Sequence, residues 1–87
     1  FDAADYLQSE EDIALYLSAV MEDGDAREIA AALGDIARAR GMGKVAAEAG
    51  LSRESLYKGL SGERAPSADT LLRVIRALGL KLAVAPA

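Results

Sequence analysis

The sequence predicts one all-α domain of about five helices, residues 1–87, with a helix-turn-helix at its centre. Apolar residues recur at helical spacing, serine or aspartate precedes most of these segments, and glycine follows them. Apolar residues make up 52% of the 87 residues, so the chain can bury a core, although a domain of this size has little surplus stability.

The first helix is expected within residues 6–24, and residues 1–24 form an acidic N-terminal segment. Ser9 is the predicted N-cap, Asp12 its capping-box partner, and Gly24 the C′ residue that ends the helix. The buried stripe of this helix is predicted to consist of Ile13, Leu17, Val20 and Met21, with Tyr16 at its flank.

The second helix is expected to begin after Asp25 and to end at Gly41. Gly34 lies inside this helix, where glycine costs about 1 kcal/mol relative to alanine. We therefore expect close packing against a neighbour at Gly34. The buried stripe is predicted to consist of Ile29, Leu33, Ile36 and Ala37.

The remaining elements are shorter. Helices are expected at about 43–49 and 53–60, followed by a loop over 61–66. The last part, residues 67–84, begins with Ser67 as the cap of a helix at about 68–78, in which Arg73 and Arg76 point away from a broad apolar face. Gly79 stops this helix, and residues 80–84 then alternate like a short strand that has no partner strand in the chain.

The stretch Gly41-Met42-Gly43-Lys44 looks like a nucleotide-binding loop, but its context excludes that reading. A dinucleotide fingerprint follows a buried strand, whereas residues 31–40 are predicted to be helical. A phosphate-binding loop has four residues between its first glycine and its Gly-Lys pair, and here only Met42 separates the glycines. We therefore expect no nucleotide cofactor.

A helix-turn-helix over residues 42–61 explains the same stretch. Ala46 is small enough for a close helix crossing, Gly50 tolerates a positive φ in the turn, and Ser52 can cap the second helix. Leu51, after the turn, is expected to be buried, and the inward anchors are Val45, Ala49 and Leu56. Gly59 is a weaker match, because a larger aliphatic residue is common there. The arrangement is of the lambda-repressor-like kind.

This motif predicts double-stranded DNA as a partner, with the second helix in the major groove. The candidate base-reading residues are Arg53, Glu54, Tyr57 and Lys58, and the candidate phosphate contacts are Arg40, Gly43, Lys44, Ser52 and Arg64. Simpler roles stay open for some of them. Tyr57 can pack at the edge of the core, Arg53 and Glu54 can be ordinary surface residues, and Arg40 can complement the end of its own helix.

One short reading helix contacts few bases, so we expect a homodimer on two half-sites. The predicted dimer or partner surface consists of Val74, Leu80, Leu82 and Val84, because an unpaired strand can also accept a strand from another chain.

Charge is distributed unevenly along the chain. Residues 1–35 carry ten acidic residues and one basic residue, a net charge of −9, whereas residues 36–87 carry nine basic and four acidic residues, a net charge of +5. The asymmetry suggests two surfaces with two partners, although helix capping and solvated faces explain part of the acidic half.

Composition excludes several classes of function. The chain has no cysteine and no histidine, so disulfides, thiolate metal sites, a cysteine nucleophile and imidazole catalysis are absent. We expect no enzyme activity, no metal and no cofactor. The lack of cysteine suits a cytoplasmic location, and no apolar run is long enough for a membrane helix. Because the sequence begins at Phe1 rather than Met, we expect that native residues precede it.

The chain resembles the addiction-module antidote (antitoxin) proteins, a prophage-type helix-turn-helix family akin to Hig-type antitoxins. The resemblance covers nearly the whole chain, and its most specific stretch is "GLSRESLYKGLSGE" (50–63) together with "ALGLKL" (77–82). Gly43-Lys44 departs from the polar pair usual in the family. The supporting stretches are "DAADYL" (2–7), "EEDIALYL" (10–17), "ALGDIARARGM" (32–42) and "TLLRVIRALGLKL" (70–82).

The resemblance implies a type II antitoxin, which neutralises a RelE-like toxin that cuts messenger RNA and represses its own operon. An acidic half suits a basic RNA-cutting partner, and a basic half suits DNA. Capping leaves Asp2, Asp5, Glu22, Asp23 and Asp35 without a role, so we take Glu22, Asp23 and Asp35 as candidate toxin contacts. The alternatives are a stand-alone prophage-type transcriptional regulator without a toxin and a purely structural interaction domain.

Overall fold

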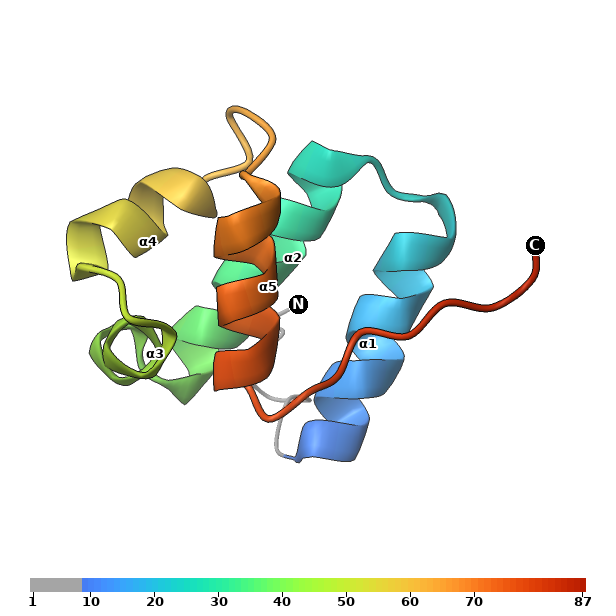
Figure 1. The fold of residues 1–87 in the computed structure, drawn as a ribbon, viewed down its shortest axis with the longest axis horizontal. Coiled ribbons are helices and arrows are strands. Elements are labelled where there is room, and N and C mark those ends of the chain that lie inside the picture. The colour runs from blue at the N-terminus through green and yellow to red at the C-terminus, as the bar shows by residue number, and fades with distance from the viewer. Residues whose placement is uncertain (1–8) are drawn as a thin grey trace.

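The computed structural model describes residues 9–87 and has five helices in that range (Figure 1). They are α1 (Glu10–Asp23), α2 (Ala26–Arg40), α3 (Met42–Ala49), α4 (Arg53–Gly59) and α5 (Ala68–Ala77). Residues 9–87 contain no β-strand. The all-α prediction of about five helices is therefore confirmed.

The helices enclose one apolar core. In Figure 1, α5 lies in front of α2, with α3 and α4 on one side and α1 on the other. Every helix contributes to the core, and within residues 9–87 the buried residues include no polar or charged side chain. The fully buried larger side chains, which come from all helices except α3, are Ile13, Leu33, Ile36, Leu56, Val74 and Ile75.

Side-chain caps begin four helices at the predicted residues, but the predicted capping box of Ser9 and Asp12 is only half formed, because within residues 9–87 the Asp12 carboxylate accepts no bond from the Ser9 N–H. The Ser9, Ser52 and Ser67 hydroxyls accept hydrogen bonds from backbone N–H groups three residues later, at 3.0–3.1 Å. Asp25 and Glu28 form a full capping box, in which each side chain accepts a hydrogen bond from the other's backbone N–H. Each such cap stabilises a helix by about 1 kcal/mol, so the boundaries follow from local sequence.

The prediction for Gly24 needs a correction. Gly24 ends α1, but its φ of −79° and ψ of 149° are extended, not left-handed. Its N–H donates to the Val20 carbonyl oxygen, and a Cβ atom at Gly24 would lie 2.5 Å from that oxygen. Close approach to the end of α1, rather than backbone handedness, therefore explains the glycine.

The predicted strand over residues 80–84 is absent. A glycine-based C-terminal motif ends α5: Gly79 has a φ of 78°, and the N–H groups of Gly79 and Leu80 donate to the carbonyl oxygens of Arg76 and Ile75. Residues 80–87 then continue without regular structure. A strand needs a hydrogen-bonded neighbour, and no segment of residues 9–87 supplies one.

Gly34 lies where α2 approaches the loop after α4. A Cβ atom at Gly34 would lie 2.9 Å from the Leu60 carbonyl oxygen, so the predicted close packing is confirmed. Gly43 in α3 has no such neighbour within 4 Å. Substitution by alanine is therefore expected to lower the stability of the domain at Gly34 and to raise it at Gly43.

We predict that Gly34→Ala destabilises the domain by about 1–3 kcal/mol, because the clash with backbone exceeds the gain in helix propensity. The control Gly43→Ala is expected to stabilise it by about 0.4–1 kcal/mol. Urea unfolding followed by circular dichroism measures both changes. Equal stabilisation by the two variants would contradict the close contact at Leu60.

Candidate nucleic-acid interface

The turn between α3 and α4 is built by Gly50. Gly50 has a φ of 72° and a ψ of 30°, the left-handed conformation that the motif requires. Its N–H donates to the Ala47 carbonyl oxygen, and the Leu51 N–H donates to the Ala46 carbonyl oxygen at 2.9 Å. These two bonds close the end of α3 and direct the chain sharply into α4.

Apolar contacts hold the two short helices against each other and against α5. The small residue Ala46 is 2% exposed, and the three predicted anchors, Val45, Ala49 and Leu56, are all buried. Figure 1 shows α3 nearly end-on while α4 lies across the view, so the two helices cross steeply. Leu51 is half-buried rather than buried, because it packs at the margin of the core.

The unusual Gly59 has a packing reason. A Cβ atom there would lie 3.2 Å from the Thr70 methyl group of α5, so a larger side chain would push the helices apart. The neighbouring Leu60 is 3% exposed and supplies the buried aliphatic side chain instead.

The outer face of α4 carries all four candidate base-reading residues. Arg53, Glu54, Tyr57 and Lys58 are exposed, and Tyr57 keeps 45% of its surface accessible. They pair with one another at i, i+4 spacing. The Lys58 ammonium lies 3.1 Å from the Glu54 carboxylate, and the Arg53 guanidinium lies 5.9 Å from the centre of the Tyr57 ring. Exposed pairs of this kind contribute about 0.2–0.5 kcal/mol each, so a ligand can replace them at little cost.

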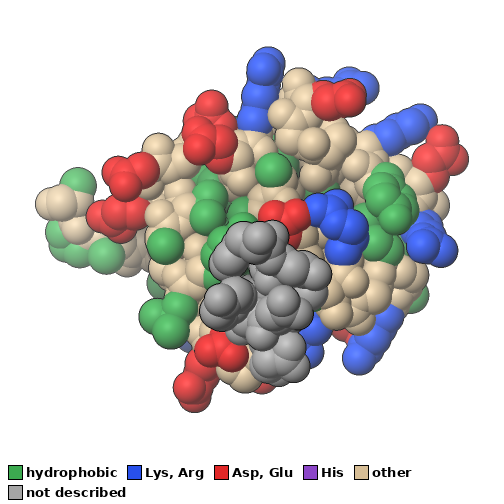
Figure 2. All heavy atoms as spheres, turned by 180° about the vertical axis from the view of Figure 1, so that it is seen from behind, with side chains coloured by type: hydrophobic (Ala, Val, Ile, Leu, Met, Phe, Trp, Pro, Cys, Tyr) green, Lys and Arg blue, Asp and Glu red, His purple; other side chains and the backbone are tan. Residues whose placement is uncertain are grey.

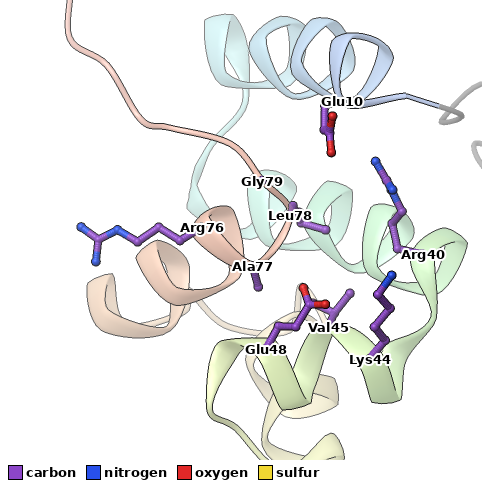
Figure 3. Close-up of a pocket in the computed structure, with 9 residues that line it drawn as sticks. All are labelled: Glu10, Arg40, Lys44, Val45, Glu48, Arg76, Ala77, Leu78 and Gly79. Atoms are coloured by element: carbon purple, nitrogen blue, oxygen red, sulfur yellow. The ribbon is translucent and has the colours of Figure 1, made fainter.

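The candidate phosphate contacts fall into separate groups. Arg40 and Lys44 share a cleft of about 380 Å³ between the ends of α1, α2, α3 and α5 (Figure 3). Arg40 and Glu10 point toward each other across this cleft, and the buried Arg40 Nε has no hydrogen-bond partner within residues 9–87. Gly43 and Arg64 are exposed, and Ser52 is occupied by capping α4.

Arg73 has a role that the sequence analysis missed. Its side chain was expected to point away from the domain, but its Nη1 donates to the Ala49 carbonyl oxygen at 3.3 Å. Its Nε donates to Asp69 at 2.9 Å. Arg73 therefore ties α5 to the last residue of α3, beside the turn at Gly50. The Asp69–Arg73 spacing of four residues was the only local signal for part of this contact.

The acidic candidates differ in their surroundings. Glu22 and Asp23 are exposed at the end of α1. Asp35 pairs with Arg38 and accepts a hydrogen bond from the Tyr16 hydroxyl at 3.4 Å. Burial, together with the Asp35 carboxylate, raises the pKa of Tyr16 above its ordinary value of 10.0. Asp35 thus has a structural role, and Asp2 and Asp5 lie outside the described residues.

The predicted dimer surface also needs a correction. Val74 is 0% exposed and belongs to the core, because it lies on the face of α5 that packs inward. Leu80 is half-buried against the core, whereas Leu82 is 47% and Val84 98% exposed. Only the last two residues therefore offer a free apolar surface.

The two signs of charge separate in space as well as in sequence. In Figure 2, lysine and arginine gather toward the end of the molecule that holds α3 and α4. Most aspartate and glutamate side chains in that view lie toward the end that holds α1. Residues 9–87 contain no cluster of metal-ligating side chains, and none of their helices is long and apolar enough to cross a membrane.

Comparison with known proteins identifies the family. A family model described as "probable addiction module antidote protein" matches residues 1–86. The chain belongs to this family. It is also 49% identical over 84 residues to an uncharacterized protein of Haemophilus influenzae, a match that covers 97% of this chain and 87% of that protein. No solved structure matches the chain. Antidotes act on a cognate toxin, so membership of the antidote family implies such a partner.

The contact made by Arg73 generates a prediction on stability. Arg73→Met removes the hydrogen bond to the Ala49 carbonyl oxygen while it keeps a similar helix propensity, so we expect a loss of about 0.5–1.5 kcal/mol. Arg76→Met is the matched control on the same helix, because the Arg76 side chain makes no hydrogen bond or ion pair within residues 9–87 and the substitution keeps its backbone bond to Gly79. It should change stability by less than about 0.5 kcal/mol in urea unfolding. Equal losses would show that Arg73 acts only through its charge.

Proposed function

We propose that this protein is the antitoxin of a type II toxin-antitoxin module. It binds and neutralises a RelE-like toxin that cuts messenger RNA, and it represses its own operon by binding operator DNA as a homodimer. Membership of the antidote family supports the neutralising role. The α3–turn–α4 unit, taken as a helix-turn-helix, supports the DNA-binding role.

The observation that carries the DNA-binding role is the exposed face of α4. The left-handed turn at Gly50 separates α4 from α3, and Arg53 and Glu54 lie in its first turn, the part of a reading helix that meets base edges. Arginine can bind guanine with two hydrogen bonds, and glutamate can accept one from cytosine. Lys44 and Arg64, both exposed, are suited to contact the phosphates on either side.

The observation that favours a basic partner elsewhere is the acidic end of α1. Glu22 and Asp23 are exposed in the last turn of α1, where negative charge opposes the helix dipole. Local helix stability therefore gives no reason for these two residues. A toxin that binds RNA presents positive charge, and complementary charge raises its rate of association.

We predict that Arg53→Ala weakens binding to the promoter DNA of the protein's own operon by about 1–3 kcal/mol and relaxes preference at one base pair. The control is Arg27→Ala, which removes another exposed positive charge, from α2, and should leave this specificity unchanged. Electrophoretic mobility shifts on promoter and random DNA measure both variants. Equal weakening on the two DNAs would assign Arg53 to a phosphate instead of a base.

We predict that Glu22→Gln with Asp23→Asn slows association with the toxin and reduces its salt dependence, because an attractive charge is lost. Asp35 is left unchanged, since it pairs with Arg38. The matched control, Glu48→Gln with Glu63→Gln, changes the net charge equally at exposed sites in α3 and in the loop between α4 and α5. Surface plasmon resonance at several salt concentrations compares the two. Similar slowing by both pairs would show that only total charge matters.

A stand-alone regulator without a toxin is the competing function. Co-expression with the product of the adjacent gene separates the two. An antitoxin should co-purify with a basic neighbour and should suppress its toxicity, whereas a stand-alone regulator should bind DNA and retain no neighbour. Growth arrest by the neighbour alone, relieved by this protein, is the decisive readout.

A further inference from the structure

The C-terminal tail, residues 80–87, leaves the domain in a fixed direction. The hydrogen bonds that follow α5 hold Gly79 and Leu80, and the Leu80 side chain packs against the core. In an extended chain Leu80, Leu82 and Val84 share one face. Exposure along this face rises from half-buried Leu80 to 47% at Leu82 and 98% at Val84. The apolar face thus begins in the core and continues into solvent.

A groove lies beside the start of the tail. It has a volume of about 230 Å³, and its lining combines apolar side chains of α5 with the tail itself. We call it the tail groove. Its lining residues are Leu72, Ile75, Arg76, Leu80, Lys81 and Leu82. This volume can hold an aliphatic side chain, and the lining includes no acidic residue.

We propose that the tails of two copies of this chain pair as antiparallel strands centred on Leu82, so that Val84 of each copy enters the tail groove of the other. This proposal deepens the homodimer of the proposed function, on which it rests. It also explains why a strand-like sequence forms no strand in a single chain: the neighbouring strand belongs to the second copy.

The sequence of the tail specifies this register. When Leu82 faces Leu82 of the second copy, Val84 lies opposite Leu80 and Ala83 lies opposite Lys81. Leu80, Leu82 and Val84 of both copies then lie on one face of the paired strands, and no lysine lies opposite a lysine. A register centred on Lys81 would place two like charges directly opposite each other. A slip of one strand by one residue would pair Leu82 with Lys81 or with Ala83 and turn the apolar stripes of the two strands to opposite faces.

Position and charge favour a second copy over the toxin as the occupant. Val84 lies opposite Leu80 in the pairing, and Leu80 lines the tail groove, so Val84 of the second copy arrives over that groove. The charged residues that line the groove are Arg76 and Lys81, both basic, which disfavours a cationic RNA-binding protein there. The exchange is symmetric, as the two-fold symmetry of a homodimer requires.

The first experiment measures mass in solution by size exclusion with light scattering, without DNA or toxin. The wild-type chain should have about twice the monomer mass of 9.1 kDa at high protein concentration and should dissociate on dilution. Val84→Glu should give the monomer at the same concentration, while its circular dichroism stays unchanged because Val84 is 98% exposed. The matched control is Leu15→Glu on α1, which is 72% exposed and should leave the dimer intact.

The second experiment tests the register by cross-linking. The chain has no cysteine, so one introduced thiol can react only with its counterpart in another copy. Leu82→Cys places the two thiols directly opposite each other and should form a disulfide-linked dimer under mild oxidation. Ala83→Cys lies opposite Lys81, which offsets its thiols by two residues, and should cross-link at least tenfold more slowly.

The outcomes separate this proposal from the proposed function. A wild-type chain that stays monomeric at about 0.5 mM, a Val84→Glu variant that stays dimeric, or equal cross-linking of the two cysteine variants would each overturn the tail pairing. Neutralisation of a toxin by the Val84→Glu monomer would still support the antitoxin role. Conversely, a tail-paired dimer that neither binds its promoter nor neutralises a toxin would keep the pairing and overturn the function.

Discussion

The arrangement of the α3–turn–α4 unit depends on one backbone conformation, the left-handed residue at position 50. With a φ of 72°, Gly50 ends α3 and sends the chain back across it within three residues. A residue with a Cβ atom adopts this left-handed conformation at a cost of about 1–2 kcal/mol, whereas glycine adopts it readily. The site has a second constraint, because the space that a Cβ atom would occupy lies 3.0 Å from the Arg73 guanidinium. The turn and the contact from α5 therefore require the same small residue, and together they fix where the outer face of α4 points.

The rest of the domain is held by shape rather than by buried polar contacts. The core of residues 9–87 contains only apolar side chains, and a purely apolar core tolerates several packing arrangements of similar energy. Close backbone approaches reduce that freedom. Gly34 allows α2 to approach the Leu60 carbonyl oxygen, and Gly59 allows α4 to approach Thr70 of α5. Glycine at these positions costs helix propensity but specifies one way of stacking the helices.

Much of this fold could be predicted because its signals are local. Ser9, Ser52 and Ser67 cap helices through hydrogen bonds from backbone N–H groups three residues later, and a spacing this short can be recognised in the sequence. Apart from the local geometry at Gly24, the errors arose where the deciding contact is distant in the sequence. Arg73 bonds to Ala49, 24 residues earlier, and Gly59 is explained by Thr70 on another helix. The surface of α5 was misjudged at Val74 because an amphipathic helix with a broad apolar face does not reveal which part its neighbours cover.

The strand-like tail shows a different limit. The alternation of apolar with other residues over 80–84 indicates a preference for strand pairing. It does not indicate whether the neighbouring strand belongs to the same chain. A single chain leaves these residues without a ladder, since no other segment of residues 9–87 is extended beside them. The exposure of the candidate residues on α4 was easier to predict, because the capped start of the helix and its one buried residue, Leu56, fix which positions face outward. Which bases or which partner they meet depends on surfaces that lie outside the chain.

A net charge of −4 opposes the proposed DNA binding, but the placement of the charges on the molecule resolves this conflict. Figure 1 shows α4 and α1 on opposite sides of α5, with the C-terminal tail extending beyond α1 along the longest dimension of 35 Å. Salt at physiological concentration screens exposed charges beyond about 8 Å. Phosphates near α4 would therefore interact with Arg53, Lys58 and Lys44 far more than with Glu22 or Asp23. Placing the two charged surfaces on opposite sides of the domain lets each act largely on its own, as the proposed binding of both DNA and a basic toxin requires.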